Sequence, residues 1–266
     1  MNIRLFLRYD GTVYHGWQIQ NRDGQESDLR TVQGTLKSAL RTLLCDDTIE
    51  PVGCSRTDAG VHADMYCASF HTATEAIPAD RICYALRPFL PEDIVVYRSE
   101  QVPEDFHARF DTVSKTYRYL FYASPFPYPC MNGKAWHIKL TETQKTPDLA
   151  AMKQAASGFV GTHDFAAFCA AGGSSKTTTR TIFRTDVEAG TVPGSDGTPL
   201  YTFYIEGDGF LYNMVRIAAG TVLYAGLGKI IPRSIPVIIA SKDRKKAGIT
   251  APACGLYLHN VSYKPF

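Results

Sequence analysis

One aspartate lies in a short segment made almost entirely of small residues. The segment runs Gly-Cys-Ser-Arg-Thr-Asp-Ala-Gly-Val-His-Ala over positions 53–63, with Asp58 near its centre. A carboxylate on such a loop is sterically open, as a nucleophile must be, because the two glycines let the backbone turn tightly. Arg56 could bind a phosphate or keep the acid ionised. The same residues also fit an Asx turn in which Asp58 caps its own loop.

Aromatic and basic residues alternate in a segment later in the chain. From Lys115 to Tyr122 the sequence reads Lys-Thr-Tyr-Arg-Tyr-Leu-Phe-Tyr. On a strand, Tyr117, Tyr119 and Phe121 would share one face. Aromatic rings mixed with basic side chains suit base stacking and phosphate contact, and they also suit the core of an ordinary sheet.

Arg216 lies among apolar residues in a segment with helical spacing. Phe210, Met214 and Ile217 share one stripe of this segment, which indicates core packing. A half-buried arginine is costly without an acid to pair with, so we expect a carboxylate to face Arg216. An ion pair of this kind would also favour the ionised form of the acid.

The composition excludes several classes of protein. The 266 residues are 45% hydrophobic and 20% charged, close to the average of globular proteins, which excludes disorder as the main state. No stretch approaches the roughly 18 apolar residues of a membrane helix, and the N-terminus lacks the apolar region of a signal peptide. We therefore expect a cytoplasmic protein with no membrane partner.

The seven cysteines and seven histidines are scattered along the chain. No two cysteines have the spacing of a zinc site or a redox pair, and their odd number argues against a secreted disulfide framework. The histidines form no grouping typical of a metal ligand set. We therefore expect any catalysis to proceed without a metal.

The net charge of +2 is divided unevenly between the two parts of the chain. Residues 1–105 hold 10 Lys and Arg against 16 Asp and Glu, a net of −6, and residues 106–266 hold 18 against 10, a net of +8. A basic part of this size suggests a polyanion, most often nucleic acid. A solvated helix face would explain the same charges without any partner.

The order of predicted elements in the first part is β-α-β-β-α-β, the order of ferredoxin-like sheets. The helix over 31–44 has apolar residues at helical spacing and Thr31 as its N-cap. The other predicted elements are strands over 3–9, 50–55, 65–72 and 94–97 and a helix that begins near Pro78.

The second part can be read in the same order. We expect strands over 113–122, 181–187, 201–206 and 257–263, and helices over 149–159 and 213–224. The fold class is therefore α+β, with two ferredoxin-like halves whose antiparallel or mixed sheets flank a central cleft. The halves would be residues 1–105, which carry the Asp58 loop, and the basic residues 106–266, which carry Tyr117 and Arg216.

Several motifs in order along nearly the whole chain resemble the tRNA pseudouridine synthase A family. They are Tyr9-Asp-Gly-Thr with Gly16-Trp-Gln, Thr31-Val-Gln-Gly, the segment 53–63, Lys115-Thr-Tyr-Arg-Tyr, His163-Asp-Phe, Arg180-Thr-Ile, Gly209-Phe-Leu with Met214-Val-Arg, and Ala251-Pro-Ala-Cys-Gly-Leu-Tyr-Leu. The resemblance implies the pseudouridine synthase fold. It also implies a homodimeric isomerase that converts uridine to pseudouridine at positions 38, 39 and 40 of the tRNA anticodon arm.

The resemblance also implies roles for individual residues. Asp58 matches the family's nucleophile, and Arg216 matches the arginine that pairs with this catalytic acid. Tyr117 matches the tyrosine that stacks on the target base, Leu256 a residue that packs near that base, and Arg56 the arginine linked to flipping the nucleotide. Because the product is an isomer of the substrate, no cofactor is required.

Two other classes of function remain open from the residues alone. A non-catalytic RNA-binding module would explain the aromatic and basic strand and the charge asymmetry. A carboxylate-based glycosidase would need two acids across one bond, and Asp111 is a possible partner for Asp58.

Overall fold

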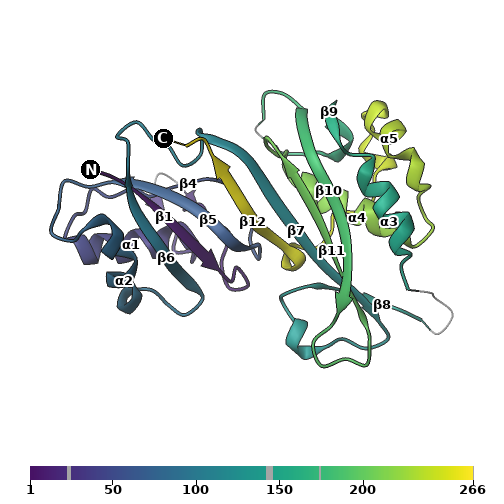
Figure 1. Cartoon of the computed structure of the whole chain (residues 1–266), viewed down its shortest axis with the longest axis horizontal. Helices are drawn as coiled ribbons and strands as arrows, with labels where there is room; N and C mark the ends of the chain where they lie inside the picture. Colours follow the sequence, from purple (N-terminus) through teal and green to yellow (C-terminus); the bar gives the residue numbers. More distant parts are fainter. Residues whose placement is uncertain (23–24, 142–145, 174, 266) are drawn as a thin grey trace. The chain divides into compact units, whose positions relative to one another are not determined.

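The computed structural model describes residues 1–22, 25–141, 146–173 and 175–265. The chain forms two compact units (Figure 1). The first unit comprises Met1–Val113 together with Tyr257–Phe266, and the second comprises Ser114–Leu256. Asp58 therefore belongs to the first unit, whereas Tyr117 and Arg216 belong to the second.

The first unit is built on a mixed sheet. Its elements are β1 (Asn2–Tyr9), β2 (Asn21–Arg22), β3 (Gln25–Glu26), α1 (Val32–Leu44), β4 (Val52–Gly53), β5 (His62–His71), η1 (Ala79–Arg81), α2 (Ile82–Ala85), η2 (Arg87–Phe89), β6 (Ile94–Val102) and all but the first residue of β12 (Leu256–Tyr263). Antiparallel pairing gives the order β6-β1-β5-β4. β12 pairs in parallel with a different stretch of β5.

The helix α1 forms where its spacing and cap predict it. The Thr31 side chain accepts a hydrogen bond from the backbone N–H of Gly34 and so caps the first turn. Leu36 and Leu40 lie on one face and are fully buried. The second expected helix, α2, is short and lies between two 3₁₀ turns. Pro88, in the second of these turns, lacks the N–H that would extend the α-helical hydrogen bonds.

The second unit also contains a mixed sheet. Its elements are all but the first two residues of β7 (Thr112–Ser124), η3 (Pro129–Met131), β8 (Trp136–Lys139), α3 (Leu149–Ser157), β9 (Gly161–Asp164), η4 (Ala166–Phe168), β10 (Thr179–Thr191), β11 (Pro199–Gly207), α4 (Met214–Gly226), η5 (Pro232–Ser234), α5 (Ile235–Ser241), η6 (Arg244–Lys246) and η7 (Ala253–Gly255). The antiparallel order is β7-β11-β10-β9, and β8 pairs in parallel with β7.

The division into units differs from the one expected at 105/106. The chain leaves the first unit after Val113, and β12 returns to it at the end. The return follows from the parallel pairing of Tyr257 and Leu258 with β5, a contact between residues almost 200 positions apart. Two strands and one α-helix of the second unit, β8, β9 and α5, are not among those that the sequence predicts.

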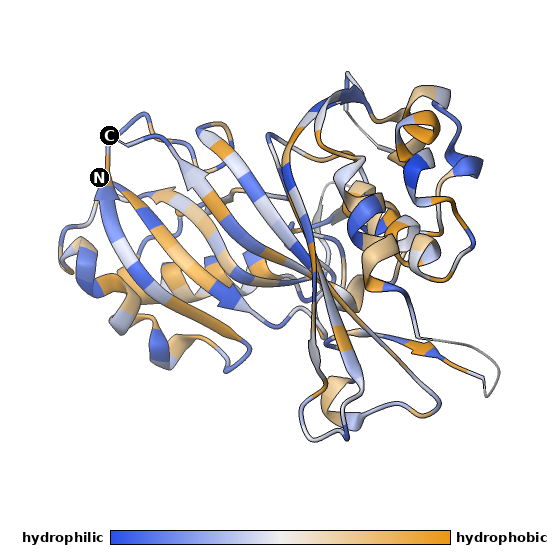
Figure 2. Ribbon diagram, turned by 45° about the vertical axis from the view of Figure 1, so that its right-hand side comes forward, coloured by the Kyte–Doolittle hydropathy of each residue, from blue (hydrophilic) through white to orange (hydrophobic). Residues whose placement is uncertain are grey.

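Polar and apolar residues alternate along many of the strands, as expected for sheets with one covered face (Figure 2). Among the residues that the structure describes, no helix is both long enough and apolar enough to cross a lipid bilayer. Nor do the described residues gather three or more histidine, cysteine or acidic side chains in a group that could hold a metal ion.

An aromatic pair fills the space beneath β4. The rings of Trp17 and Tyr66 stack with centroids 4.2 Å apart. A Cβ atom on Gly53 would lie 2.1 Å from the Tyr66 Oη atom and 2.4 Å from Trp17 Cε2. Any side chain at position 53 would overlap these two rings, so β4 can pack against them only because this residue is glycine.

We predict that Gly53→Ala lowers the free energy of unfolding by about 1–3 kcal/mol, because the new methyl group would overlap two buried rings. Urea unfolding followed by tryptophan fluorescence measures the change. Gly190→Ala is the matched control, because a Cβ there meets no atom within 4 Å. Equal stability of the two variants would show that the Trp17–Tyr66 pair moves aside easily.

Candidate active site

Asp58 lies in the connection between β4 and β5. The strands remain paired one residue beyond β4, where the Cys54 N–H donates to the Cys67 carbonyl at 2.8 Å. The Val61 N–H then donates to the Asp58 carbonyl at 3.2 Å and closes a tight turn. Gly60 has a φ of 77° in this turn, a conformation that favours glycine. Asp58 is half-buried at the start of the turn.

The N-terminal loop holds this connection in place through the backbone. The Trp17 N–H donates to the Thr57 carbonyl at 3.1 Å, and the Gly60 N–H donates to the Tyr14 carbonyl at 3.2 Å. Gly16 has a φ of 91°, and a Cβ there would lie 2.6 Å from the Thr57 carbonyl oxygen. The residues on both sides of Asp58 are therefore anchored to one neighbouring loop.

Two buried side chains add to this support. The hydroxyls of Tyr9 and Thr57 lie 2.8 Å apart in a buried hydrogen bond. The ring of His62 is buried, stacks on Tyr257 with centroids 4.5 Å apart, and accepts a hydrogen bond at Nδ1 from the Gly11 N–H at 3.1 Å. His62 lies within the segment 53–63, but the sequence did not indicate it as a site residue.

Arg56 lies in the same connection as Asp58, and its side chain is exposed. The two residues flank Thr57, whose backbone and hydroxyl are both fixed. The segment 53–63 therefore forms a turn that is fixed by hydrogen bonds from the N-terminal loop, and Arg56 in this turn is exposed to solvent.

The three aromatic residues of the predicted strand face have different surroundings in the second unit. Tyr119 and Phe121 are fully buried, and the Tyr119 hydroxyl donates to the Pro252 carbonyl at 2.7 Å. Tyr117 lies opposite Ile205 of β11, and its ring meets Phe210 edge to face with centroids 5.2 Å apart. Core packing therefore accounts for Tyr119 and Phe121. Tyr117 is also buried, 7% exposed, and packs against an aromatic neighbour.

Arg216 is oriented by two acceptors. Its Nε donates to the Ala251 carbonyl at 2.7 Å, and its Nη1 donates to Asn213 Oδ1 at 2.7 Å. The Ala251 N–H in turn donates to the Arg216 carbonyl at 3.1 Å. The guanidinium is thus fixed by the residues before and beside α4. The carboxylate partner expected for Arg216 stays a prediction.

The segment that carries Leu256 packs tightly within the second unit. A Cβ on Gly255 would lie 2.5 Å from the Leu120 carbonyl oxygen and 2.7 Å from Tyr119 Cζ. Leu256 itself is buried, 7% exposed, at the start of β12. Burial raises the pKa of the Cys254 thiol, so this thiol is a poor nucleophile near neutral pH.

The candidate residues are divided between the two units, Arg56 and Asp58 in the first and Tyr117, Arg216 and Leu256 in the second. Arg56 and Asp58 share one loop of the first unit. In the second unit, Arg216 is bonded to Ala251, while Leu256 follows Gly255, which packs against Tyr119. Asn213 and His62 are the additional residues that hold these groups in position.

Asn213 has a left-handed backbone with a φ of 59° and also supplies an acceptor to Arg216. Asn213→Ala and Asn213→Gly both remove the acceptor, but only alanine is strained at this φ. We predict that the alanine variant is the less stable of the two by about 1 kcal/mol. Urea unfolding of the two variants and the parent measures the difference. A glycine variant no more stable than the alanine variant would contradict the strain argument.

Comparison with known proteins agrees with the order of these segments. The profile of the family described as "tRNA pseudouridine synthase" matches residues 6–111 and 155–264. These ranges include the Asp58 turn, the Arg216 helix and the Leu256 segment. Tyr117 lies between the two matched ranges.

Curated relatives match over almost their whole length. A "tRNA pseudouridine synthase A" of Ruminiclostridium cellulolyticum is 46% identical over 98% of this chain and 99% of its own. Proteins of the same name from Acetivibrio thermocellus and Bacillus subtilis are 46% and 41% identical, over 98% and 99% of this chain and 99% of their own. With a profile match over most of its length and relatives well above 30% identity, the chain belongs to the tRNA pseudouridine synthase family.

Proposed function

We propose that this protein isomerises uridine to pseudouridine at positions 38, 39 and 40 of the tRNA anticodon stem-loop. Membership of the family supports an isomerase that acts on tRNA. The observation that carries the proposal is the Asp58 turn, which is anchored on both sides of the acid by the N-terminal loop. These backbone bonds fix the position from which the Asp58 side chain extends.

The reaction breaks the bond between the ribose and a uracil nitrogen and forms a bond between the ribose and a uracil carbon. No atom is gained or lost, so neither an oxidant nor a group carrier is required. We assign Asp58 as the nucleophile, because a covalent adduct divides this rearrangement into easier steps. The detached base can then turn before the new bond forms.

Tyr117 is the residue that we assign to the target base. Its ring is held edge to face by Phe210. Such a ring can stack on a flipped pyrimidine at little entropic cost, because its own orientation is already restricted. We also assign its hydroxyl a part in proton movement. Leu256 supplies an apolar side chain for the same base.

Arg216 and Arg56 have different roles in this proposal. Arg216 favours the ionised form of the catalytic acid, and its two fixed hydrogen bonds keep the guanidinium in one orientation. Arg56 is exposed and assists extrusion of the nucleotide through a phosphate contact. Extrusion costs a few kcal/mol of stacking and pairing, and phosphate contacts from the basic part of the chain help to offset this cost.

The proposal also includes the arrangement of the strands in each half of the chain. The strand order β6-β1-β5-β4 in the first unit supports a ferredoxin-like sheet, and the chain order β7-α3-β10-β11-α4-β12 supports a second βαββαβ pattern. We propose two ferredoxin-like halves, tRNA as the macromolecular substrate, and a homodimer. The central cleft and the cytoplasmic location stay predictions.

The two alternative functions gain no support from the structure. The proposed second acid of a glycosidase, Asp111, accepts a hydrogen bond from the His107 N–H at 2.7 Å and so caps its own loop. A non-catalytic RNA-binding module would not require the bracing around Asp58. Family membership favours the isomerase over both alternatives.

We predict that Asp58→Ala and Asp58→Asn lower the rate of pseudouridine formation by about 1,000-fold or more, because each variant removes the nucleophile. The measurement is conversion of uridine in an anticodon-arm transcript, followed by mass spectrometry after derivatisation. Asp47→Asn, an exposed acid in another loop, is the control and should leave the rate unchanged. Conversion near the parent rate by either Asp58 variant would remove Asp58 from the mechanism.

A second prediction separates the ring of Tyr117 from its hydroxyl. Tyr117→Phe keeps the ring and should bind tRNA with nearly unchanged affinity, whereas Tyr117→Ala loses the stacking surface and should bind about 5- to 100-fold more weakly. Filter binding measures the affinity, and the conversion assay measures the rate. Much weaker binding by the phenylalanine variant would show that the hydroxyl, and not the ring, contacts the RNA.

A further inference from the structure

A short segment of the second unit crosses α4 and reaches Arg216. Residues 247–252, between η6 and η7, form neither helix nor strand, and we call them the strap. A Cβ on Gly220 of α4 would lie 2.1 Å from the Ile249 carbonyl oxygen, and a Cβ on Gly248 would lie 2.6 Å from the Thr221 backbone nitrogen. Glycines on both sides therefore let the backbones of the strap and the helix meet directly.

The strap is bonded to α4 at two points. The Gly248 N–H donates to the Thr221 hydroxyl at 2.8 Å, and this hydroxyl donates to the Ile217 carbonyl at 2.7 Å. Further along the strap, the Ala251 N–H donates to the Arg216 carbonyl at 3.1 Å, and the Arg216 Nε donates to the Ala251 carbonyl at 2.7 Å. The acceptor that orients Arg216 is thus part of the strap.

Arg244 of η6 holds the strap through its side chain. Its Nη1 donates to the Gly248 carbonyl at 2.7 Å, and its Nη2 donates to the Thr250 hydroxyl at 3.0 Å. One planar guanidinium therefore binds two points of the strap at once. Hydrogen bonds from a charged donor are stronger than those between neutral groups. The second of these bonds lies one residue before Ala251.

Tyr119 holds the strap on the other side of Ala251. The Tyr119 ring is fully buried in the sheet, and its hydroxyl donates to the Pro252 carbonyl at 2.7 Å. Ala251 therefore lies between Thr250, which Arg244 binds, and Pro252, which Tyr119 binds. Side chains from two different elements fix the residues on either side of the acceptor for Arg216.

The position of Arg244 has an energetic cost that its hydrogen bonds offset. The residue is half-buried, and burial lowers the pKa of its guanidinium. An arginine nevertheless stays protonated at neutral pH, so a charged group is partly removed from water here. Lys245, the next residue of the same turn, is exposed. Arg244 is therefore placed to bind the strap, whereas its neighbour extends into solvent.

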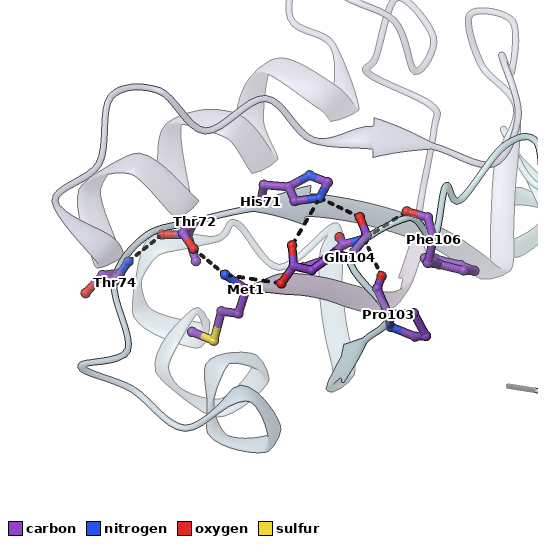
Figure 3. A network of polar contacts seen from close by, with 8 residues as sticks. Met1, His71, Thr72, Thr74, Pro103, Glu104 and Phe106 are labelled. Atoms are coloured by element: carbon purple, nitrogen blue, oxygen red, sulfur yellow. Dashed lines mark hydrogen bonds and ion pairs between the residues drawn. The ribbon is translucent and has the colours of Figure 1, made fainter.

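A polar network of the first unit provides a contrast. Figure 3 shows Glu104 between the amino group of Met1 and the ring of His71, with its oxygens 3.7 Å from a nitrogen of each. The Glu104 and His71 side chains are 68% and 63% exposed, and exposed ion pairs contribute little to stability. None of these three residues has an assigned role in the reaction, whereas the contacts of Arg244 end beside the acceptor for Arg216.

We propose that Arg244 is a positioning residue for the reaction, because it fixes the strap and so sets the place of the Ala251 carbonyl. The orientation of the Arg216 guanidinium follows from that carbonyl. The attraction between a guanidinium and a carboxylate depends on this orientation, since the N–H donors are directional. The inference rests on the role that the proposed function gives to Arg216, and it assigns Arg244 no contact with the RNA.

Replacing Arg244 separates positioning from RNA binding. Arg244→Met keeps an unbranched side chain and loses every donor. The single-turnover rate of pseudouridine formation at saturating enzyme should fall about 10- to 100-fold, because small misplacements of a site residue are costly. The dissociation constant for tRNA, from filter binding, should change less than about threefold, because only the site geometry is altered. Lys245→Met, which removes the same charge from the same turn, is the matched control and should leave the rate unchanged.

The acceptor side of the contact supplies a second test with little risk to folding. Thr250→Val keeps the shape of the side chain and removes the acceptor for Arg244, whereas Thr250→Ser keeps the hydroxyl. The valine variant should lose about 3- to 10-fold in the single-turnover rate, the equivalent of about one hydrogen bond, and the serine variant should stay within about twofold of the parent. Circular dichroism confirms folding. If Arg244→Met does not fold, the two Thr250 variants decide.

A double-mutant cycle tests whether Arg244 acts through Arg216. Arg216→Lys lacks the Nε–H that the Ala251 carbonyl accepts, so the strap no longer orients this side chain in the same way. Adding Arg244→Met to this variant should lower its single-turnover rate by less than about twofold further, because effects that share one route do not multiply. A general loss of packing would instead lower the rate equally in both backgrounds.

The contrary results each have a distinct meaning. Unchanged rates in Arg244→Met and Thr250→Val would refute the proposal, and an equal loss in both Arg216 backgrounds would reduce Arg244 to general support of the fold. Weaker tRNA binding at an unchanged single-turnover rate would assign Arg244 to the RNA. All three results leave the proposed function intact, because the parent chain still forms pseudouridine. A parent chain that forms none would overturn both the function and this inference.

Discussion

The backbone contact between Thr57 and Trp17 is the interaction on which the candidate site depends. A nucleophilic carboxylate must be open to its target and yet fixed, and a loop of small residues supplies only the first property. The second comes from elsewhere in the sequence, through the Trp17 and Tyr14 backbone and the Tyr9 hydroxyl. Gly16 permits this approach, because any side chain there would meet the Thr57 carbonyl.

The same principle applies to Arg216 in the second unit. A guanidinium has five N–H donors, and a freely rotating one would pair with any nearby acceptor. The Ala251 carbonyl and the Asn213 amide take two of these donors and fix the plane of the group. Asn213 can do so because it adopts a left-handed backbone at the start of α4. In both units, therefore, the residue assigned to chemistry is held by a neighbour with an unusual backbone conformation.

The sequence predicted those elements that are stabilised by residues close together in the chain. The helix α1 and its Thr31 cap follow from residues within a few positions of one another, and the same holds for Asp58 in a glycine-flanked turn. Contacts between distant residues could not be read in this way. The return of β12 to β5 and the burial of His62 against Tyr257 each join residues almost 200 positions apart. Asn213 was missed because its role depends on a conformation and not on its residue type.

The net charge of a sequence segment likewise does not predict how its charged side chains are distributed on the folded surface. Residues 1–105 carry a net charge of −6, which would suggest an acidic part with no basic surface. The sheet nevertheless brings Arg4, Arg8 and Arg98 to one face, because alternate positions of β1 and a bulge in its pairing with β6 point the same way. Aromatic rings contact these arginines, and Glu100 pairs with both Arg4 and Arg98. The distribution that the strands impose, and not the sum, decides which partner such a surface fits.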